Sequence, residues 1–112
     1  MADQGYIETL QRLIVELHGC STRHLGTVSV HETFLGKTLW EGNVEVFAVI
    51  DHPRAQQCFA WASETHRQGR RARLFAVLAT SVIRTPLDAV KFVRVINSAR
   101  LIDELSRIGE HE

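Results

Sequence analysis

The sequence predicts an α+β domain in which an antiparallel sheet of about four strands is flanked by an N-terminal and a C-terminal helix. Hydrophobic residues recur with a helical period near both ends of the chain and with a period of two in its middle. Turns that contain Gly or Pro separate the alternating segments, which is typical of a meander, where each strand pairs with the next. Because 112 residues suffice for one modest core, residues 1–112 are expected to form a single domain.

The N-terminal half is predicted to contain one helix and one hairpin. Residues 6–17 have the 3.6-residue period of an amphipathic helix, and Gly19 follows as a helix stop. A polar turn is expected at residues 21–26, before two alternating runs at residues 27–34 and 40–50. These two runs are expected to pair as antiparallel strands.

The register of this hairpin follows from the requirement that both apolar rows lie on the same face of the sheet. Pairing Glu32 with Trp40 and Val28 with Val44 meets that requirement and leaves a three-residue loop in which Gly36 can adopt a positive φ. A two-residue turn would instead set Glu32 against a second glutamate and mix the two faces. The sequence therefore favours the longer loop.

The C-terminal half leaves two assignments open. Residues 55–67 fit either a short helix or a strand, and we favour the strand because the polar turn HRQGRR and the apolar run RLFAVLA come next. Thr85, Pro86 and Asp88 have the spacing of an N-cap, a first-turn proline and a capping-box acid. The helix that they predict competes with a strand over residues 90–96, which are rich in β-branched side chains, followed by a later helix.

If residues 90–96 are helical, the C-terminal helix has more apolar surface than one sheet face can cover. One apolar stripe includes Val90 and Val93, and a second stripe runs beside it. This second stripe comprises Phe92, Val95, Ile96, Ala99 and Ile102. The candidate dimer interface consists of its larger members, Phe92, Val95, Ile96 and Ile102. Exposed apolar stripes mark self-association or partner surfaces, so we expect a homodimer, and a fully buried helix is the alternative.

Composition and charge exclude several classes of protein. Hydrophobic residues make up 45% of the chain and charged residues 23%, which is typical of a globular protein. Thirteen basic and thirteen acidic side chains cancel, so no global field draws the protein toward nucleic acid or an anionic membrane. The sequence has no signal-like start and no apolar run of the roughly 20 residues that span a bilayer. We therefore expect a cytoplasmic protein without a membrane partner, whose Cys20 and Cys58 are buried thiols.

Glu32 is unusual because the alternation puts its carboxylate on the apolar face between Val30 and Phe34. Apolar surroundings favour the protonated form of a carboxylate, which suits general acid or base chemistry, and a neighbouring indole could stack on a planar ligand. Glu32, Trp40 and Trp61 are therefore the candidate ligand-binding residues. The leading hypothesis is a non-enzymatic homo-oligomeric domain that binds a small ligand or a partner protein. An acid/base enzyme that uses Glu32 is the alternative.

Other chemistry has weaker signals. A basic cluster that could contact phosphates comprises Arg67, Arg70, Arg71 and Arg73. A nucleic-acid accessory role is therefore a further alternative, although a solvated turn explains the same arginines. His18, Cys20 and His24 do not have the spacing of a zinc site, and no motif for nucleophilic catalysis, phosphate binding or dinucleotide binding occurs. We therefore expect no metal and no cofactor.

The stretch VHETFLGKTLWEGNVEVF, followed by DHPRAQQCFAWA, resembles a family of small uncharacterised bacterial proteins. The short chain is also similar to the products of mobile integron gene cassettes. The resemblance extends over residues 18–96 and contains no catalytic signature. It implies a bacterial, freestanding domain without an assigned activity, and it assigns no functional residue.

Overall fold

The fold consists of one antiparallel sheet and two helices, and the computed structural model describes residues 4–65 and 71–96. Its elements, in chain order, are α1 (Gln4–His18), β1 (Thr22–Phe34), β2 (Lys37–Val49), β3 (Gln57–Thr65), β4 (Arg71–Leu78) and a helix over residues 86–96. The strands lie in the order β1-β2-β3-β4, and each pairs antiparallel with the next. The predicted α+β meander is therefore confirmed, and residues 90–96 are helical rather than a fifth strand. In the two described ranges, no helix has the length and apolarity needed to cross a membrane.

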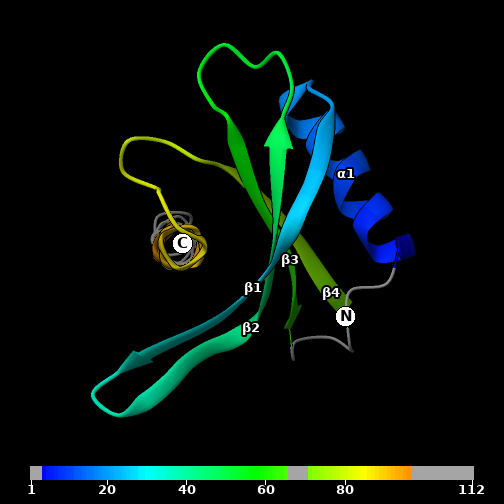
Figure 1. Ribbon diagram of the computed structural model, residues 1–112. Helices are drawn as coiled ribbons and strands as arrows, with labels where there is room; N and C mark the ends of the chain where they lie inside the picture. The colour runs from blue at the N-terminus through cyan, green and yellow to red at the C-terminus, as the bar shows by residue number, and fades with distance from the viewer. Residues whose placement is uncertain (1–3, 66–70, 97–112) are drawn as a thin grey trace, which may run out of the picture.

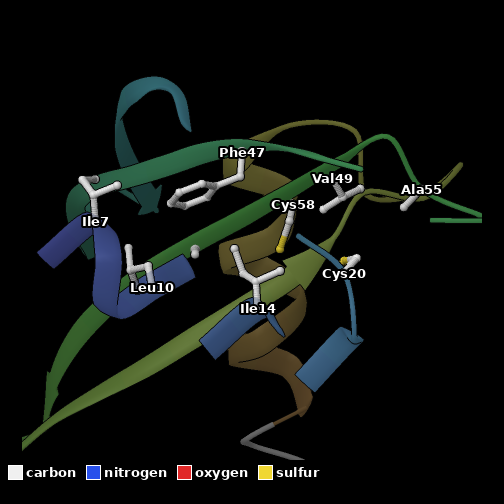
Figure 2. Close-up of a cluster of buried hydrophobic side chains, with 9 residues drawn as sticks. Ile7, Leu10, Ile14, Cys20, Phe47, Val49, Ala55 and Cys58 are labelled. Carbon is white, nitrogen blue, oxygen red and sulfur yellow. The ribbon is translucent and has the colours of Figure 1, made fainter. Parts of the chain in front are cut away.

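The two helices cover opposite faces of the sheet (Figure 1). Because successive strand residues point to opposite faces, β3 supplies both cores. The cluster on the α1 side, shown in Figure 2, contains Ile7, Leu10, Ile14, Cys20, Phe47, Val49, Ala55, Cys58 and Ala60. The cluster beneath the helix at residues 86–96 contains Val30, Val44, Phe59, Trp61, Ile83, Ala89 and Val90. The middle of the sheet is thus buried on both faces.

Helix α1 packs on the sheet through a row spaced with the helical period. Ile7, Leu10 and Ile14 form this row and are buried, whereas Leu17 in the last turn is 58% exposed. Gly19 follows the helix with a φ of +68°. That left-handed conformation favours glycine, so the predicted helix stop is confirmed.

The β1–β2 hairpin confirms the predicted register, in which Val28 pairs with Val44 and Glu32 pairs with Trp40. This pairing keeps the apolar rows of both strands on the face that the helix at residues 86–96 covers. Each of the two strands has 13 residues, and the end of the hairpin extends away from both helices (Figure 1).

The loop of this hairpin differs from the prediction. Leu35 and Gly36 form a two-residue turn, and both have positive φ, 52° and 77° respectively. The faces do not mix, because Leu39 is an extra residue in β2 that restores the register before Trp40. The predicted three-residue loop is therefore wrong. The two-residue turn followed by the bulge gives the same pairing of Glu32 with Trp40 that the longer loop would give.

Strand β1 begins at Thr22, so the polar turn predicted at residues 21–26 is mostly strand. A second bulge at Leu25 shifts the register between His24 and Gly26. His24 therefore lies opposite Phe47, on the α1 side of the sheet, and the two rings are 5.3 Å apart between centroids. The sequence did not reveal this part of the strand for two reasons: the segment is polar, and the bulge interrupts the alternation of apolar and polar residues.

The helix at residues 86–96 begins with the predicted capping box. The Asp88 N–H donates to Thr85 Oγ1 (3.1 Å), and Asp88 Oδ2 accepts from the backbone N–H groups of Arg84 (3.1 Å) and Thr85 (3.2 Å). These hydrogen bonds, with the one from Arg84 as the largest contribution, hold the pKa of Asp88 below its ordinary value. Pro86 is the first helical residue, where a missing N–H costs no hydrogen bond.

Both cysteines are free thiols in the α1-side cluster, as the sequence predicts (Figure 2). Burial, with a further contribution from the nearby Cys20, raises the pKa of the Cys58 thiol to about 12. A thiol with this pKa stays protonated at neutral pH. Cys58 therefore acts as a small apolar core group.

We expect the Cys58 thiol to resist alkylation in the folded protein at pH 8, where a thiol with a pKa of about 12 is ionised in about one molecule in ten thousand. Iodoacetamide treatment followed by mass spectrometry should label Cys58 only after urea is added. A Cys20→Ser variant makes Cys58 the single target. Rapid labelling at pH 8 without urea would contradict its burial.

Candidate functional site

A partly buried ion pair joins the hairpin to the C-terminal helix. The side chain of Glu32 on β1 is 2% exposed, whereas that of Arg94 is 46% exposed. Arg94 Nε donates to both carboxylate oxygens of Glu32 (3.1 Å each), and Arg94 Nη2 donates to Oε2 (2.5 Å). Hydrogen bonding to Glu32 raises the pKa of Arg94, so the guanidinium stays charged. The pair fixes the helix against β1.

Two tryptophans lie on the same face as this ion pair. Trp40 pairs with Glu32 across the hairpin, and its ring meets Trp61 edge-on at a centroid distance of 6.3 Å. Trp61 contacts Phe75 in turn, at 5.5 Å between centroids. The Trp40 indole also covers Gly42, because a Cβ added at Gly42 would lie 2.9 Å from Trp40 Cη2. Gly42 therefore provides the space that the indole occupies.

The structure brings the three predicted ligand-binding residues together but encloses two of them. Glu32 and Trp61 are each 2% exposed, and Trp40 is partly buried. Both oxygens of Glu32 accept hydrogen bonds from Arg94. Arg94 was not predicted as a site residue, because it is 62 positions away from Glu32 and only the fold brings them together. A ligand or a catalytic role for Glu32 would require Arg94 to move away.

The outer side of the same helix is apolar. Ala89 and Val90 face the core, whereas Phe92, Val95 and Ile96 are 45%, 59% and 39% exposed. The exposed residues have i, i+3 and i+4 spacing, so they share one side of the helix. The remaining member of the candidate interface, Ile102, lies outside the described residues. The described part of the stripe is thus open to a partner.

A second buried carboxylate, Glu45 on β2, was not predicted as a site residue. It is 1% exposed on the α1 side of the sheet. Its Oε1 accepts a hydrogen bond from Thr27 Oγ1 (2.5 Å) and lies 2.8 Å from His24 Nε2. The alternation of β2 shows that Glu45 points away from the Val44 face, but not that α1 and its neighbours cover it. No sequence signal marked His24, because its position depends on the bulge at Leu25.

This second group resembles a carboxylate-oriented histidine, since a buried acid holds one ring nitrogen while the His24 side chain remains 31% exposed. Tyr6 lies in the same region, and its Oη accepts the Ala62 N–H (2.9 Å). Burial raises the pKa of Tyr6, and the charge of Glu45 contributes in the same direction. The hydrogen bonds of Thr27 and His24 satisfy the buried acid, which is what a structural role requires.

The three residues considered for a metal site have separate surroundings. His18 Nε2 bonds to the Ala76 carbonyl oxygen (3.1 Å), Cys20 packs in the core, and His24 contacts Glu45. Over residues 4–65 and 71–96, no group of three or more His, Cys, Asp or Glu side chains is arranged to hold a metal ion.

The arginine cluster is described only at its edge. Arg73 on β4 is exposed. Arg67 and Arg70 lie outside the described residues, and so does the side chain of Arg71. The nucleic-acid role predicted for these four residues therefore stays a prediction.

Removal of Arg94 is expected to destabilise the fold, because it leaves the buried Glu32 without its charge partner. In urea unfolding, Arg94→Met should clearly lower the free energy of unfolding, whereas Arg12→Met on α1 should change it by less than about 0.5 kcal/mol. Adding Glu32→Gln to Arg94→Met should recover part of the loss, since an amide costs less to bury than an unpaired charge. Strict additivity of the two single substitutions would argue against a direct ion pair.

Substitution of Gly42 tests the packing of Trp40. In Gly42→Ala the new Cβ would lie 2.9 Å from the indole, so the ring must shift. The free energy of unfolding should therefore fall by about 1–3 kcal/mol. Near-UV circular dichroism should report the changed tryptophan environment. Gly26→Ala is the matched control, because a Cβ at Gly26 meets nothing within 4 Å. Equal effects of the two substitutions would show that Trp40 does not need this space.

Comparison of the chain with models of known protein families, with curated proteins and with solved structures finds no match. These comparisons transfer no activity to the chain, so its function has to be inferred from its own side chains. Two features bear on that inference: the ion pair that anchors the C-terminal helix, and the apolar surface on the outer side of the same helix.

Proposed function

We propose that the protein is a non-enzymatic domain that works as a homodimer through the apolar outer side of the helix at residues 86–96. The observation that carries this proposal is the exposure of Phe92, Val95 and Ile96 on a helix whose other side is anchored in the core. Apolar side chains grouped on one exposed side of a helix are typical of association surfaces.

The anchoring contacts explain why the chain does not bury this stripe itself. Ala89 and Val90 pack in the core on the inner side of the helix, and Arg94 is bound to Glu32. Rotation of the helix to bury Phe92 would break the ion pair and expose Val90 to water, and both changes are unfavourable. A second chain can cover the stripe without disturbing either contact.

The surroundings of the buried acids support a non-enzymatic role. Glu32 and Glu45 are the buried charged residues of the described part of the chain. The oxygens of Glu32 bind Arg94, and Glu45 Oε1 binds Thr27 and contacts His24. A general acid or base needs an atom directed at the substrate, whereas these atoms are directed at neighbouring side chains.

The other hypotheses need larger changes. A small ligand at Glu32, Trp40 and Trp61, or catalysis by Glu32, would first have to displace the Arg94 guanidinium and reach the enclosed Trp61. A nucleic-acid role rests on four arginines, of which only the Arg73 side chain is described. Dimerisation requires no rearrangement, and we therefore prefer it.

Disruption of the outer side should convert a dimer into a folded monomer. The double variant Phe92→Ser with Val95→Ser removes side chains that solvent already reaches, so its melting temperature should change little while the dimer dissociates. Size-exclusion chromatography with light scattering reports the mass. Val82→Ser is the matched control, because Val82 is 81% exposed outside this helix, and it should remain dimeric. A wild-type chain that stays monomeric at submillimolar concentration would refute the proposal.

A further inference from the structure

We infer that the apolar outer side of the helix at residues 86–96 is covered by the tip of the β1–β2 hairpin of a second copy. The tip is residues 34–39, and the stripe that it covers is the exposed group Phe92, Val95 and Ile96. This inference rests on the proposed homodimer and names the segment that each copy gives to the other. Because the contact joins two different surfaces, a two-fold axis between them forms it twice.

The hairpin tip is a second group of exposed apolar side chains. Phe34, Leu35 and Leu39 are 63%, 86% and 43% exposed. The end of the hairpin extends away from both helices, so the described part of the same chain leaves these side chains open (Figure 1). Apolar side chains that are grouped and exposed are typical of association surfaces.

The backbone at the tip gives a further reason to expect a partner there. Leu35 has a φ of 52° and is followed by Gly36, which also has a positive φ. Two-residue turns of this kind favour Asn before Gly, and a bulky side chain rarely adopts the left-handed region. Leu35 therefore destabilises the turn relative to Asn, and in a single chain its side chain gains no burial in return. Burial in an interface would offset that strain.

The stripe alone is too small for a stable dimer. A specific interface takes about 800 Å² from each partner. Phe92, Val95 and Ile96 are between 39% and 59% exposed, so they supply only a small part of this area. The tip adds three further apolar side chains, and the two-fold axis covers both groups on both copies. The tip is therefore a better cover for the stripe than the stripe of the other copy.

Both surfaces are presented on the same side of the sheet. The helix lies on the face that contains Val30. Phe34 points to this face as well, because the extra residue near the tip, Leu39, is in β2 and the alternation of β1 continues from Val30 to Phe34. A partner that approaches from this side reaches the tip and the stripe together.

Leu35→Asn separates association from folding. Asn suits the left-handed backbone but removes the apolar side chain, so the variant should dimerise at least about tenfold more weakly than wild type. Its melting temperature should not fall when both proteins are compared at a dilution where they are monomeric. Analytical ultracentrifugation gives the two dissociation constants. Val82→Asn is the matched control, because Val82 is 81% exposed outside both surfaces, and it should dimerise like wild type.

Cross-linking identifies what covers the stripe. One chain carries Phe34→Cys and another carries Val95→Cys, and the mixture is treated with a short bismaleimide. The native Cys20 and Cys58 are buried, so the reagent reaches the introduced thiols first. Mass spectrometry of the intact linked chains should show mainly the mixed pair. A chain with Val82→Cys in place of Phe34→Cys is the control and should not link to the Val95→Cys chain.

The outcomes separate the tip from the dimer itself. Mixed linked pairs, together with weaker dimerisation of Leu35→Asn, support the inference. Val95→Cys chains that link mainly to each other would overturn it in favour of helix against helix and leave the homodimer in place. A monomeric wild type would overturn both proposals. Circular dichroism checks that each variant is folded, and Leu39→Cys replaces Phe34→Cys if that variant does not fold.

A bilayer is the rival occupant of the tip. Wild type and Leu35→Asn are therefore also sedimented with vesicles of phosphatidylglycerol and phosphatidylcholine. If the substitution abolishes vesicle binding and leaves the dimer unchanged, the inference is overturned and the tip is assigned to a membrane surface.

Discussion

The placement of the C-terminal helix depends on the contact between Glu32 and Arg94. The capping box determines where this helix begins, and the buried Ala89 and Val90 determine which side faces the sheet. Farther along the helix, Arg94 binds Glu32 and so links the helix to β1, the strand at the edge of the sheet. Because the carboxylate is enclosed, its charge needs the guanidinium as a partner. The contact that satisfies this charge also keeps Phe92 and its neighbours on the outer side.

The β1–β2 hairpin carries a buried acid on each of its two faces, and the two acids have different kinds of partner. Glu45 is satisfied from within the hairpin, by Thr27 and His24, so its hydrogen bonds hold two adjacent strands together. Glu32 is satisfied by a helix that follows much later in the chain. Buried ionic groups add less to stability than apolar groups of similar size, but each one penalises arrangements that leave it unpaired. In this fold, one acid constrains the strands and the other constrains the helix.

Local patterns predicted the elements and the pairing of the β1–β2 hairpin, whereas the side-chain partners of the two buried acids could not be predicted. The helical period, the alternation of the strands, and the spacing of Thr85, Pro86 and Asp88 each depend on neighbouring residues, so they are visible in a single sequence. The bulges at Leu25 and Leu39 have no comparable pattern. At the site, the alternation of the strands was enough to group Glu32 with the two tryptophans. It did not indicate Arg94 or the hydrogen bonds to Glu45, because those partners are brought together only by the fold.

The meander has a consequence for the order in which the chain folds. Each strand pairs only with the strand before or after it, so the sheet can assemble from hairpins whose ends are close along the chain. The short connections between neighbouring strands close at a small entropic cost, and folds dominated by contacts between residues close in sequence form comparatively fast. The Glu32 and Arg94 contact closes a loop of 62 positions and needs a formed hairpin as well as a formed helix. It is therefore expected to form late, and until then the apolar face around Trp61 is open to water.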